Sequence, residues 1–373
     1  MKRLYFVCII IALSFSSPFL SCRNGDDTVI PSAGTPVGKG FYLLNEGNMG
    51  TNKASLDYYD YETEEYYKNI FPERNPHIIK DLGDVGNDLK IYGGKMYAVI
   101  NCSNRIEIMD ADSARHIASI DIPNCRNITF YKGYAYVSSY AGPVQTDPNA
   151  RLGYVARIDT ASLKIIDTCT VGYQPDEMTV RNDKLYIANS GGYRYPDYDN
   201  TVSVIDLNTF REIKKIQVAI NLNRITADSY GNIYVISGGD YKNIKSNLYI
   251  IDLQDNVSAP FNIEASRMAL CRDSLYVLCG MDRYRLSGNV NASYIIINTK
   301  TKSIVSRQFI DDEAKQQIIM PYGIAVNPET GEIYITDARD YVLPGRLYCF
   351  THEGKIKREI ITGDIPSVIA FRR

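Results

Sequence analysis

The stretch Asn182–Ile216 has the sequence NDKLYIANSGGYRYPDYDNTVSVIDLNTFREIKKI and contains three short apolar segments separated by turn residues. Segment 185–188 follows a polar turn, a loop rich in Gly and Tyr occupies residues 189–200, and segments 202–206 and 211–218 flank a second turn. Strands of about four to eight residues separated by clusters of Gly, Asn and Asp are typical of antiparallel hairpins. The stretch therefore predicts a small antiparallel sheet.

This unit recurs along the chain. Its first strand is found seven times, as GFYLLN, KMYAVI, YAYVSS, KLYIAN, NIYVIS, SLYVLC and EIYITD, centred on Tyr42, Tyr97, Tyr136, Tyr186, Tyr234, Tyr276 and Tyr334. The following strand and its turn are also found seven times, and five copies carry an Asp at the start of the turn, namely Asp60, Asp110, Asp159, Asp206 and Asp252. Such an Asp is expected to accept hydrogen bonds from backbone N–H groups two residues further on.

A further strand precedes each Tyr strand except the first, and the missing copy is found at the far end of the chain, in Pro366–Phe371. The carboxy-terminal strand is therefore predicted to complete the sheet that the amino terminus begins, which removes the open edges of a linear array. Seven such sheets make an all-β fold, a seven-bladed β-propeller of four-stranded antiparallel blades, over residues 39–373.

The amino terminus is predicted to lie outside this fold. Residues 1–21 have the positive start (Lys2, Arg3) and apolar run of a secretory signal, and the run is too short to span a membrane with its flanks. Ser21–Cys22 resembles the lipobox of bacterial lipoproteins, so Cys22 is predicted to be lipidated, and residues 22–38 are predicted to form a flexible tether. The acidic residues after Cys22 resemble the surface-export signal of Bacteroidetes lipoproteins, which implies an outer-membrane anchor facing the cell exterior.

Composition and motifs argue against several function classes. A formal net charge of −2 does not favour nucleic-acid binding, which normally needs a basic face. With only three His and no Ser/His/Asp elbow, HExxH or EF-hand pattern, we expect no enzyme, no bound metal and no cofactor. Asp176–Glu177 and the pair Asp337 and Asp340 are the carboxylates best suited to acid/base chemistry. Cys102 and Cys125 are predicted to lie on one face and are candidates for a disulfide.

One face of the predicted propeller is the candidate binding surface. The loops after the second and fourth strands of each blade emerge on this long-loop face, whereas the opposite, short-turn face carries tight turns. Long loops on a rigid scaffold are where function usually lies. The predicted ligand-binding residues on the long-loop face are Arg126, Tyr140, Tyr193, Tyr195, Arg224, Tyr241, Arg267, Tyr284, Tyr322, Arg339 and Tyr341.

The residue pair just before each inner strand is predicted to line the mouth of the central channel. These pairs are Asn87–Asp88, Arg126–Asn127, Asp176–Glu177, Asn223–Arg224, Ser266–Arg267, Tyr322–Gly323 and Ser367–Val368. The resulting ring is polar and mixed in sign, which suits a ligand rich in amides and phosphate.

The units LYIANSGG and TVSVIDLNTFREIKKI resemble the YncE-like, YVTN-type propellers of bacteria. The opening FYLLNEGNMGTNKASLDYYDYETEEY, the segment GDVGNDLKIYGGKMYAVIN and the lipobox resemble a narrower group, the Bacteroidetes surface lipoproteins that include cobalamin-capturing propellers. This resemblance implies binding of a corrinoid (cobalamin) ligand and its delivery to a TonB-dependent outer-membrane transporter. The alternatives are a glycan-binding surface propeller, a propeller lyase or lactonase, and a protein–protein scaffold.

Overall fold

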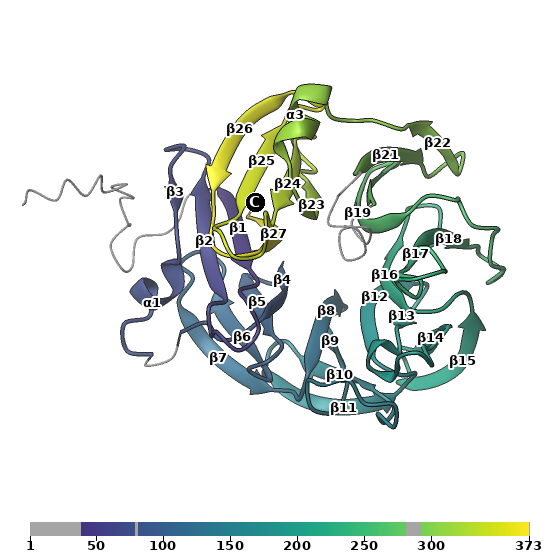
Figure 1. Ribbon diagram of the computed structural model, residues 1–373. Helices are drawn as coiled ribbons and strands as arrows, with labels where there is room; N and C mark the ends of the chain where they lie inside the picture. The colour runs from purple at the N-terminus through teal and green to yellow at the C-terminus, as the bar shows by residue number, and fades with distance from the viewer. Residues whose placement is uncertain (1–38, 79–80, 281–291, 373) are drawn as a thin grey trace, which may run out of the picture.

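A computed structural model describes residues 39–78, 81–280 and 292–372, and their strands form seven antiparallel sheets arranged around a central axis (Figure 1). The predicted seven-bladed propeller is therefore confirmed. Blades are numbered in chain order, so that blade 1 contains β1. No helix among the described residues is long and apolar enough to cross a membrane.

Blades 1 to 4 contain four strands each, and the innermost strand is named first. Blade 1 consists of β27 (Pro366–Arg372), β1 (Gly40–Asn45), β2 (Ser55–Asp60) and β3 (Tyr66–Tyr67), and blade 2 of β4 (Gly86–Tyr92), β5 (Lys95–Ile100), β6 (Arg105–Asp110) and β7 (His116–Asp121). Blade 3 consists of β8 (Cys125–Tyr131), β9 (Tyr134–Ser139), β10 (Tyr154–Asp159) and β11 (Lys164–Thr170), and blade 4 of β12 (Pro175–Arg181), β13 (Lys184–Asn189), β14 (Thr201–Asp206) and β15 (Arg211–Gln217).

The remaining blades follow the same order. Blade 5 consists of β16 (Leu222–Ala227), β17 (Ile233–Ser237) and β18 (Asn247–Ile251), blade 6 of β19 (Ala265–Cys271), β20 (Ser274–Cys279), β21 (Ser293–Asn298) and β22 (Ser303–Ser306), and blade 7 of β23 (Pro321–Val326), β24 (Ile333–Asp337), β25 (Arg346–Phe350) and β26 (Ile356–Ile361). Short helical segments lie in the connections: α1 (Ile70–Arg74), η1 (Gly192–Arg194) and α3 (Asp312–Gln317).

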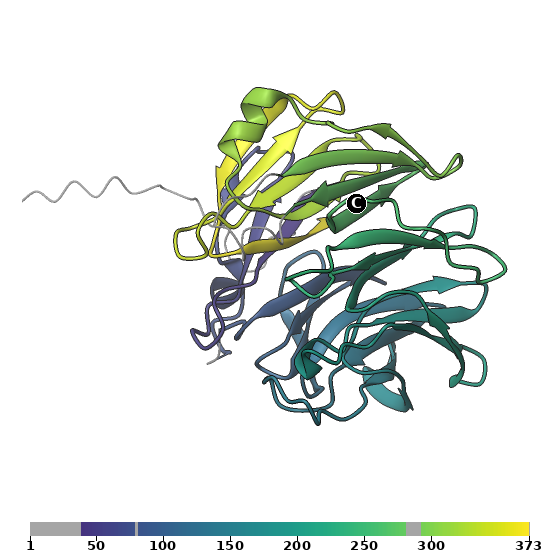
Figure 2. The same ribbon diagram turned by 45° about the vertical axis from the view of Figure 1, so that its right-hand side comes forward.

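The carboxy-terminal strand closes the ring as predicted. β27 pairs with β1 in antiparallel register, with Phe371 opposite Phe41 and Ile369 opposite Leu43. In both ribbon views the yellow strand β27 therefore lies next to the purple strands at the start of the propeller (Figures 1 and 2). β27 pairs with the inner edge of β1 and β2 pairs with its outer edge, so β1 has no open edge.

Blade 5 departs from the regular pattern in its outermost segment. Beyond β18 the chain forms an isolated bridge between Ile251 and Val257, and the Ser258 N–H donates to the Ile250 carbonyl at 2.8 Å. The Ile250 N–H donates instead to the Ser258 hydroxyl oxygen, and the nearby Pro260 has no N–H to donate. A fourth segment is thus present in blade 5, but side-chain bonding and proline prevent a regular ladder.

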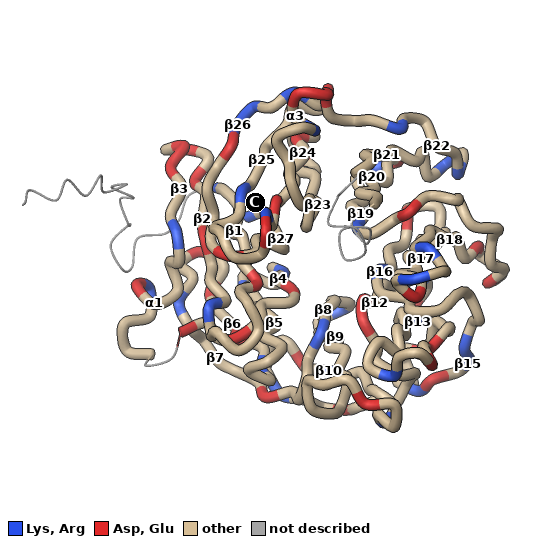
Figure 3. Tube along the Cα trace, viewed as in Figure 1, with Lys and Arg blue, Asp and Glu red and all other residues tan. Residues whose placement is uncertain are grey.

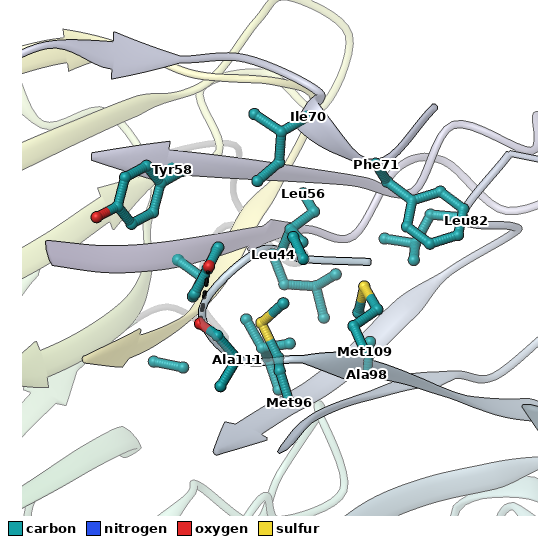
Figure 4. Packing of buried hydrophobic residues seen from close by; sticks show 14 of the residues in the cluster. Leu44, Leu56, Tyr58, Ile70, Phe71, Leu82, Met96, Ala98, Met109 and Ala111 are labelled. Carbon is teal, nitrogen blue, oxygen red and sulfur yellow. Dashed lines mark hydrogen bonds between the residues drawn. The ribbon is translucent and has the colours of Figure 1, made fainter. Parts of the chain in front are cut away.

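Neighbouring blades pack through apolar residues on both faces of their strands. Between blades 1 and 2, Leu44 and Leu56 face Met96 and Met109 (Figure 4). Tyr42 is fully buried in the same cluster, and its hydroxyl donates to the Ala111 carbonyl oxygen at 2.9 Å. Tyr42 therefore supplies a large apolar ring to the interface between the blades and still satisfies its polar end.

The predicted Asp turns are confirmed on the short-turn face. The Asp159 carboxylate accepts hydrogen bonds from the N–H groups of Ala161 and Ser162 at 2.8 and 2.7 Å. Equivalent contacts are made by Asp60, Asp110, Asp206 and Asp252. These hydrogen bonds lower the pKa of the Asp159 carboxyl, the Ser162 N–H being the strongest contributor.

Cys102 and Cys125 do not form the disulfide for which they were candidates. All six described cysteines are free thiols. The Cys125 sulfur lies 3.5 Å from the Arg105 carbonyl oxygen and 3.6 Å from that of Ile100. Burial raises the pKa of the Cys125 thiol to about 12, so this group behaves as a small buried hydrophobe.

Candidate functional site

Every innermost strand begins with a β-bulge at the long-loop face. In β8, Cys125 pairs with Ser139 and Ile128 with Val137, so that two residues, Arg126 and Asn127, lie opposite the single residue Ser138. The same shift occurs at the start of β4, β12, β16, β19, β23 and β27. A bulge re-aims side chains and bends the strand, and the seven bulges direct the predicted pairs toward the channel.

Side chains of the second strands satisfy some of the backbone groups that the bulges remove from the ladder. The Asn127 N–H donates to the Ser138 hydroxyl at 3.1 Å, and the Gly323 N–H donates to that of Thr336 at 2.7 Å. Gly323 is required at its position, since a Cβ would lie 2.1 Å from the Ser367 carbonyl oxygen. The bulges are therefore fixed parts of the scaffold.

Buried polar residues at the ends of the second strands anchor the long loops. The Asn101 side chain donates to Asn124 Oδ1 at 2.7 Å, and the Ser237 hydroxyl donates to the Ile220 carbonyl oxygen at 2.7 Å. The Asp337 carboxylate, one of the candidate acid/base groups, accepts from the Met320 N–H at 2.8 Å and is fully buried. Asp337 is therefore an anchor of the loop before β23, and it does not face the channel.

The bulge residues surround a cavity of about 610 Å³ at the channel mouth. All seven predicted pairs line it, and of the predicted ligand-binding residues Arg126, Tyr140, Tyr193, Arg224, Tyr241, Arg267, Tyr322 and Tyr341 do so. Figure 3 shows a basic position on β8 close to an acidic position on β12. The volume falls within the range of about 300–1,000 Å³ that is usual for small-molecule sites.

Two of the described predicted residues lie outside this lining. Tyr195 is 39% exposed outside the cavity, where its hydroxyl contacts the Lys242 ammonium, and Arg339 is half-buried outside the lining. Tyr284 and Cys22 fall outside the described residues. The mouth therefore brings together most of the predicted set, and Tyr195 and Arg339 belong to the outer rim.

Blades 3 and 4 meet in a cluster around Asp176. This carboxylate accepts from the Tyr140 hydroxyl at 2.9 Å, the Asn127 amide at 3.3 Å and Arg126 Nε at 3.5 Å. The Arg126 guanidinium also lies 4.7 Å from the centre of the Tyr140 ring, and Tyr193 meets that ring edge-on at 5.0 Å. Burial raises the pKa of the Tyr140 phenol, so this hydroxyl stays protonated and donates.

Blades 4 and 5 are joined by a second ion pair. Arg224 Nε lies 3.4 Å from one oxygen of Glu177, and the other oxygen accepts from the Ile225 N–H at 3.1 Å. Asp88 makes the corresponding contact to the Ile128 N–H at 3.0 Å between blades 2 and 3. Burial raises the pKa of Glu177 and Arg224 opposes this shift. These carboxylates thus bridge neighbouring inner strands.

Glu46 is a mouth residue that sequence reasoning did not single out. It follows β1, lines the cavity and accepts a hydrogen bond of 2.7 Å from the Tyr322 hydroxyl of blade 7. Burial raises the pKa of Glu46, and the bond from Tyr322 opposes this shift. Its position directly after the Tyr strand, in LLNEGN, is the signal that points to it.

A smaller cavity of about 260 Å³ lies beside the mouth under the loop after β9. Its lining includes Tyr140, Tyr193, Gln145, Arg151 and Gln174. The Tyr140–Tyr193 pair contributes to both cavities, so it forms the wall between them. Among the described residues, no group of three or more His, Cys, Asp or Glu side chains is placed to hold a metal ion.

Comparisons with solved structures agree with the fold. A quinonprotein alcohol dehydrogenase-like protein from Bacteroides thetaiotaomicron has a TM-score of 0.63 at 17% identity over 91% of this chain and 79% of its own. A hypothetical selenium-binding protein from Sulfolobus tokodaii has a TM-score of 0.65 at 13% identity, covering 92% of this chain and 96% of its own. AztD from Citrobacter koseri has a TM-score of 0.53 at 9% identity, covering 89% and 97%.

Identities this low establish a shared propeller architecture and carry no information about ligands. A search of curated proteins finds no match. One family model, described as a domain of unknown function, matches residues 39–362, which is nearly the whole propeller. The chain therefore belongs to that family, DUF5074.

Proposed function

We propose that this protein is a ligand-binding propeller that takes a polar small molecule, a corrinoid such as cobalamin, at the mouth of its channel. The observation that carries the proposal is the convergence of seven bulged residue pairs, with Tyr140, Tyr193, Tyr241 and Tyr341, on one cavity of about 610 Å³. Strand ladders and buried anchors fix the mouth before binding, so little ordering entropy opposes association.

Corrinoid chemistry matches the lining of the mouth. A corrinoid is a broad ring fringed with amides, and the mouth offers aromatic faces together with amide, guanidinium and carboxylate groups. Such a ligand is larger than the molecules that a cavity of this volume encloses. We therefore propose that it lies across the mouth and also contacts the outer rim, where Tyr195 and Arg339 are found.

Binding, rather than catalysis, is the proposed role of the charged groups. Asp176 and Glu177 each have an arginine partner, at 3.5 and 3.4 Å respectively, and each holds a neighbouring blade. A general acid or base needs a carboxyl group that is available to the substrate. Because contacts within the protein already occupy both carboxylates, a binding role is favoured over a catalytic one.

We further propose that the protein is a lipoprotein anchored through Cys22 in the outer membrane, facing the exterior, and that it passes its ligand to a TonB-dependent transporter. The chain reaches the propeller at Lys39 on the short-turn face, because β1 runs from there toward Glu46 at the mouth. A tether of residues 22–38 can extend to roughly 60 Å. That reach lets the mouth turn toward a neighbouring transporter in the same membrane.

Isothermal titration of the folded propeller with cyanocobalamin tests the ligand. Saturable heat at micromolar protein concentration is expected, and the absence of heat from a sample with native circular dichroism rules the corrinoid out. A glycan array run in parallel examines the sugar-binding alternative, and selective glycan binding without corrinoid binding would replace the proposal. Radiolabelled palmitate incorporation that is lost in Cys22→Ala tests the anchor.

A further inference from the structure

Arg224 and Arg267 occupy equivalent positions on neighbouring blades. Each is the second residue of its bulge, opposite Ile236 and Leu278 respectively. Each guanidinium turns back to donate through Nη1 to the carbonyl oxygen of the preceding residue, at 3.2 Å for Arg224 and 3.0 Å for Arg267. Both side chains line the channel mouth. The repeat of the fold therefore places two cations in the same pose, side by side around the ring.

The charges of the three mouth arginines are not equally balanced. Arg126 and Arg224 have carboxylate partners in Asp176 and Glu177. For Arg267, no carboxylate of the described residues lies within 4.0 Å, and its guanidinium lies instead 5.3 Å from the centre of the Tyr322 ring. Glu46, a further carboxylate of the mouth, is bonded to the Tyr322 hydroxyl. Arg267 thus faces the cavity as a cation that the described part of the protein leaves without an ion pair.

An arginine in this position is electrostatically unfavourable and cannot lose its charge at physiological pH. Burial lowers the pKa of Arg267 and the positive charge of Arg224 lowers it further, whereas Tyr322, Glu177 and Glu46 oppose these shifts only in part. A bound anion relieves both effects, because it replaces hydrogen bonds that burial removes and its negative charge offsets the repulsion between the two guanidinium groups. Guanidinium groups bind the planar edge of a carboxylate or phosphate through paired N–H donors.

We propose that Arg224 and Arg267 form an oxyanion subsite, which receives a phosphate ester or carboxylate group of the ligand at the channel mouth. This inference rests on the proposed function only in placing a ligand at the mouth. It adds the chemical class that the ligand presents there. The centre of the Tyr322 ring lies 5.3 Å from the Arg267 guanidinium. The ring would therefore contact the part of the ligand that carries the anion, and it favours an aromatic or flat group there.

Small probes test the subsite without reference to the natural ligand. Phenyl phosphate and benzoate are titrated into the propeller at constant ionic strength, with heat and thermal midpoint as readouts. Saturable binding of either probe is expected, and the preferred probe distinguishes a phosphoryl from a carboxylate group. Arg267→Gln, which keeps most of the side-chain volume, is expected to weaken binding by about ten- to a hundredfold, the range for one charge-assisted hydrogen-bonding partner.

Arg272→Gln is the matched control, because Arg272 lies beyond the other end of β19, exposed on the short-turn face. It is expected to bind both probes like the wild type. If circular dichroism shows that Arg267→Gln is unfolded, Arg267→Lys replaces it, and weakened binding is again expected because the paired donors are lost. The proposal is overturned if neither probe binds the wild type saturably, or if the Arg267 variant binds as tightly as the wild type.

Cyanocobalamin and dicyanocobinamide separate this inference from the proposed function, since only the former carries a phosphodiester. Cobalamin binding that is tighter than cobinamide binding in the wild type, with the difference lost in Arg267→Gln, supports both. If the small probes bind and cobalamin does not, the corrinoid proposal is refuted and the oxyanion subsite is supported. If the wild type and Arg267→Gln bind cobalamin equally well, the oxyanion subsite is refuted and the corrinoid proposal is supported.

Discussion

The Tyr322 hydroxyl donates a hydrogen bond of 2.7 Å to Oε2 of Glu46, which connects blade 7 to blade 1 at the channel mouth. The two residues are far apart in the sequence and meet because β27 closes the ring. The contact therefore links closure of the fold to the electrostatics of the candidate site.

Replacement of Glu46 by Gln is expected to change how stability depends on pH. Burial raises the pKa of Glu46 in the folded state above its ordinary value of 4.5. The folded protein thus holds this proton more tightly than the unfolded chain, so the stability contributed by the group is complete below the unfolded pKa and is lost as pH rises through the folded pKa. The stability of Glu46→Gln should not fall with rising pH in this way, so the variant should unfold at a higher temperature than the wild type at pH 8.

Thermal unfolding at pH 5, 6, 7 and 8 measures this effect, and Glu62→Gln, an exposed substitution in the same blade, is the control. If the unfolding temperatures of the wild type and Glu46→Gln change with pH in parallel, ionisation of the Glu46 carboxyl does not destabilise the folded state, and the prediction is wrong.

Tyr140→Phe is expected to destabilise the fold. The hydroxyl of Tyr140 is buried and donates to Asp176 at 2.9 Å, and hydrogen bonds to charged groups contribute about 1.5–3 kcal/mol. Urea denaturation should show a loss in that range. Tyr195→Phe, whose ring is 39% exposed on the rim, should lie close to the wild type, and equal losses for the two variants would contradict the assignment.

Deletion of residues 366–373 is expected to abolish cooperative unfolding. Without β27, the inner edge of β1 has no partner, and unpaired strand edges promote association. Size-exclusion chromatography should show aggregates, and circular dichroism should show a broad transition. Removal of Arg373 alone leaves β27 intact and should behave like the full chain; a monomeric, sharply unfolding deletion variant would argue against closure.

Tyr193→Ala is expected to raise the Kd for the ligand by about tenfold or more, as is usual for aromatic anchors in binding sites. Tyr193 lines the mouth and packs against Tyr140, so the substitution removes the wall between the two cavities. Tyr241→Ala should act in the same direction, and Tyr195→Ala should have a smaller effect.

Asp159→Ala is the complementary variant for the same titration. Asp159 caps a turn on the short-turn face, so its loss should lower the unfolding midpoint and leave the Kd unchanged. Affinity that falls equally in Asp159→Ala and Tyr193→Ala would indicate a general loss of folded protein and not a local site.

The repeat pattern predicted the architecture because each local signal agrees with the global fold. Strands such as KLYIAN are apolar on both faces, and an Asp recurs where a turn needs its carboxylate. The exception, the outer segment of blade 5, lies where proline and side-chain hydrogen bonding compete with the ladder. The residue pairs at the mouth were also predictable, because their position relative to the inner strand is the same in every blade.

The electrostatic pairing at the mouth was not predictable. Glu46 lies in a loop whose sequence does not show that it meets Tyr322, and Asp337, a candidate acid/base group, anchors a backbone segment. Tyr195 and Tyr193 are two residues apart in one loop, yet only Tyr193 lines the cavity. Such differences depend on side-chain direction and on contacts between distant segments.

The sequence by itself determined the number of blades, the strand that closes the ring, the face that carries long loops and the residues that begin each inner strand. These properties follow from local periodicity and turn chemistry, which repeat along the chain. Only the tertiary structure decided which charges neutralise one another, because the ion pairs of the mouth join residues of neighbouring blades that are far apart in sequence. It is this pairing that leaves Arg267 facing the cavity beside Arg224.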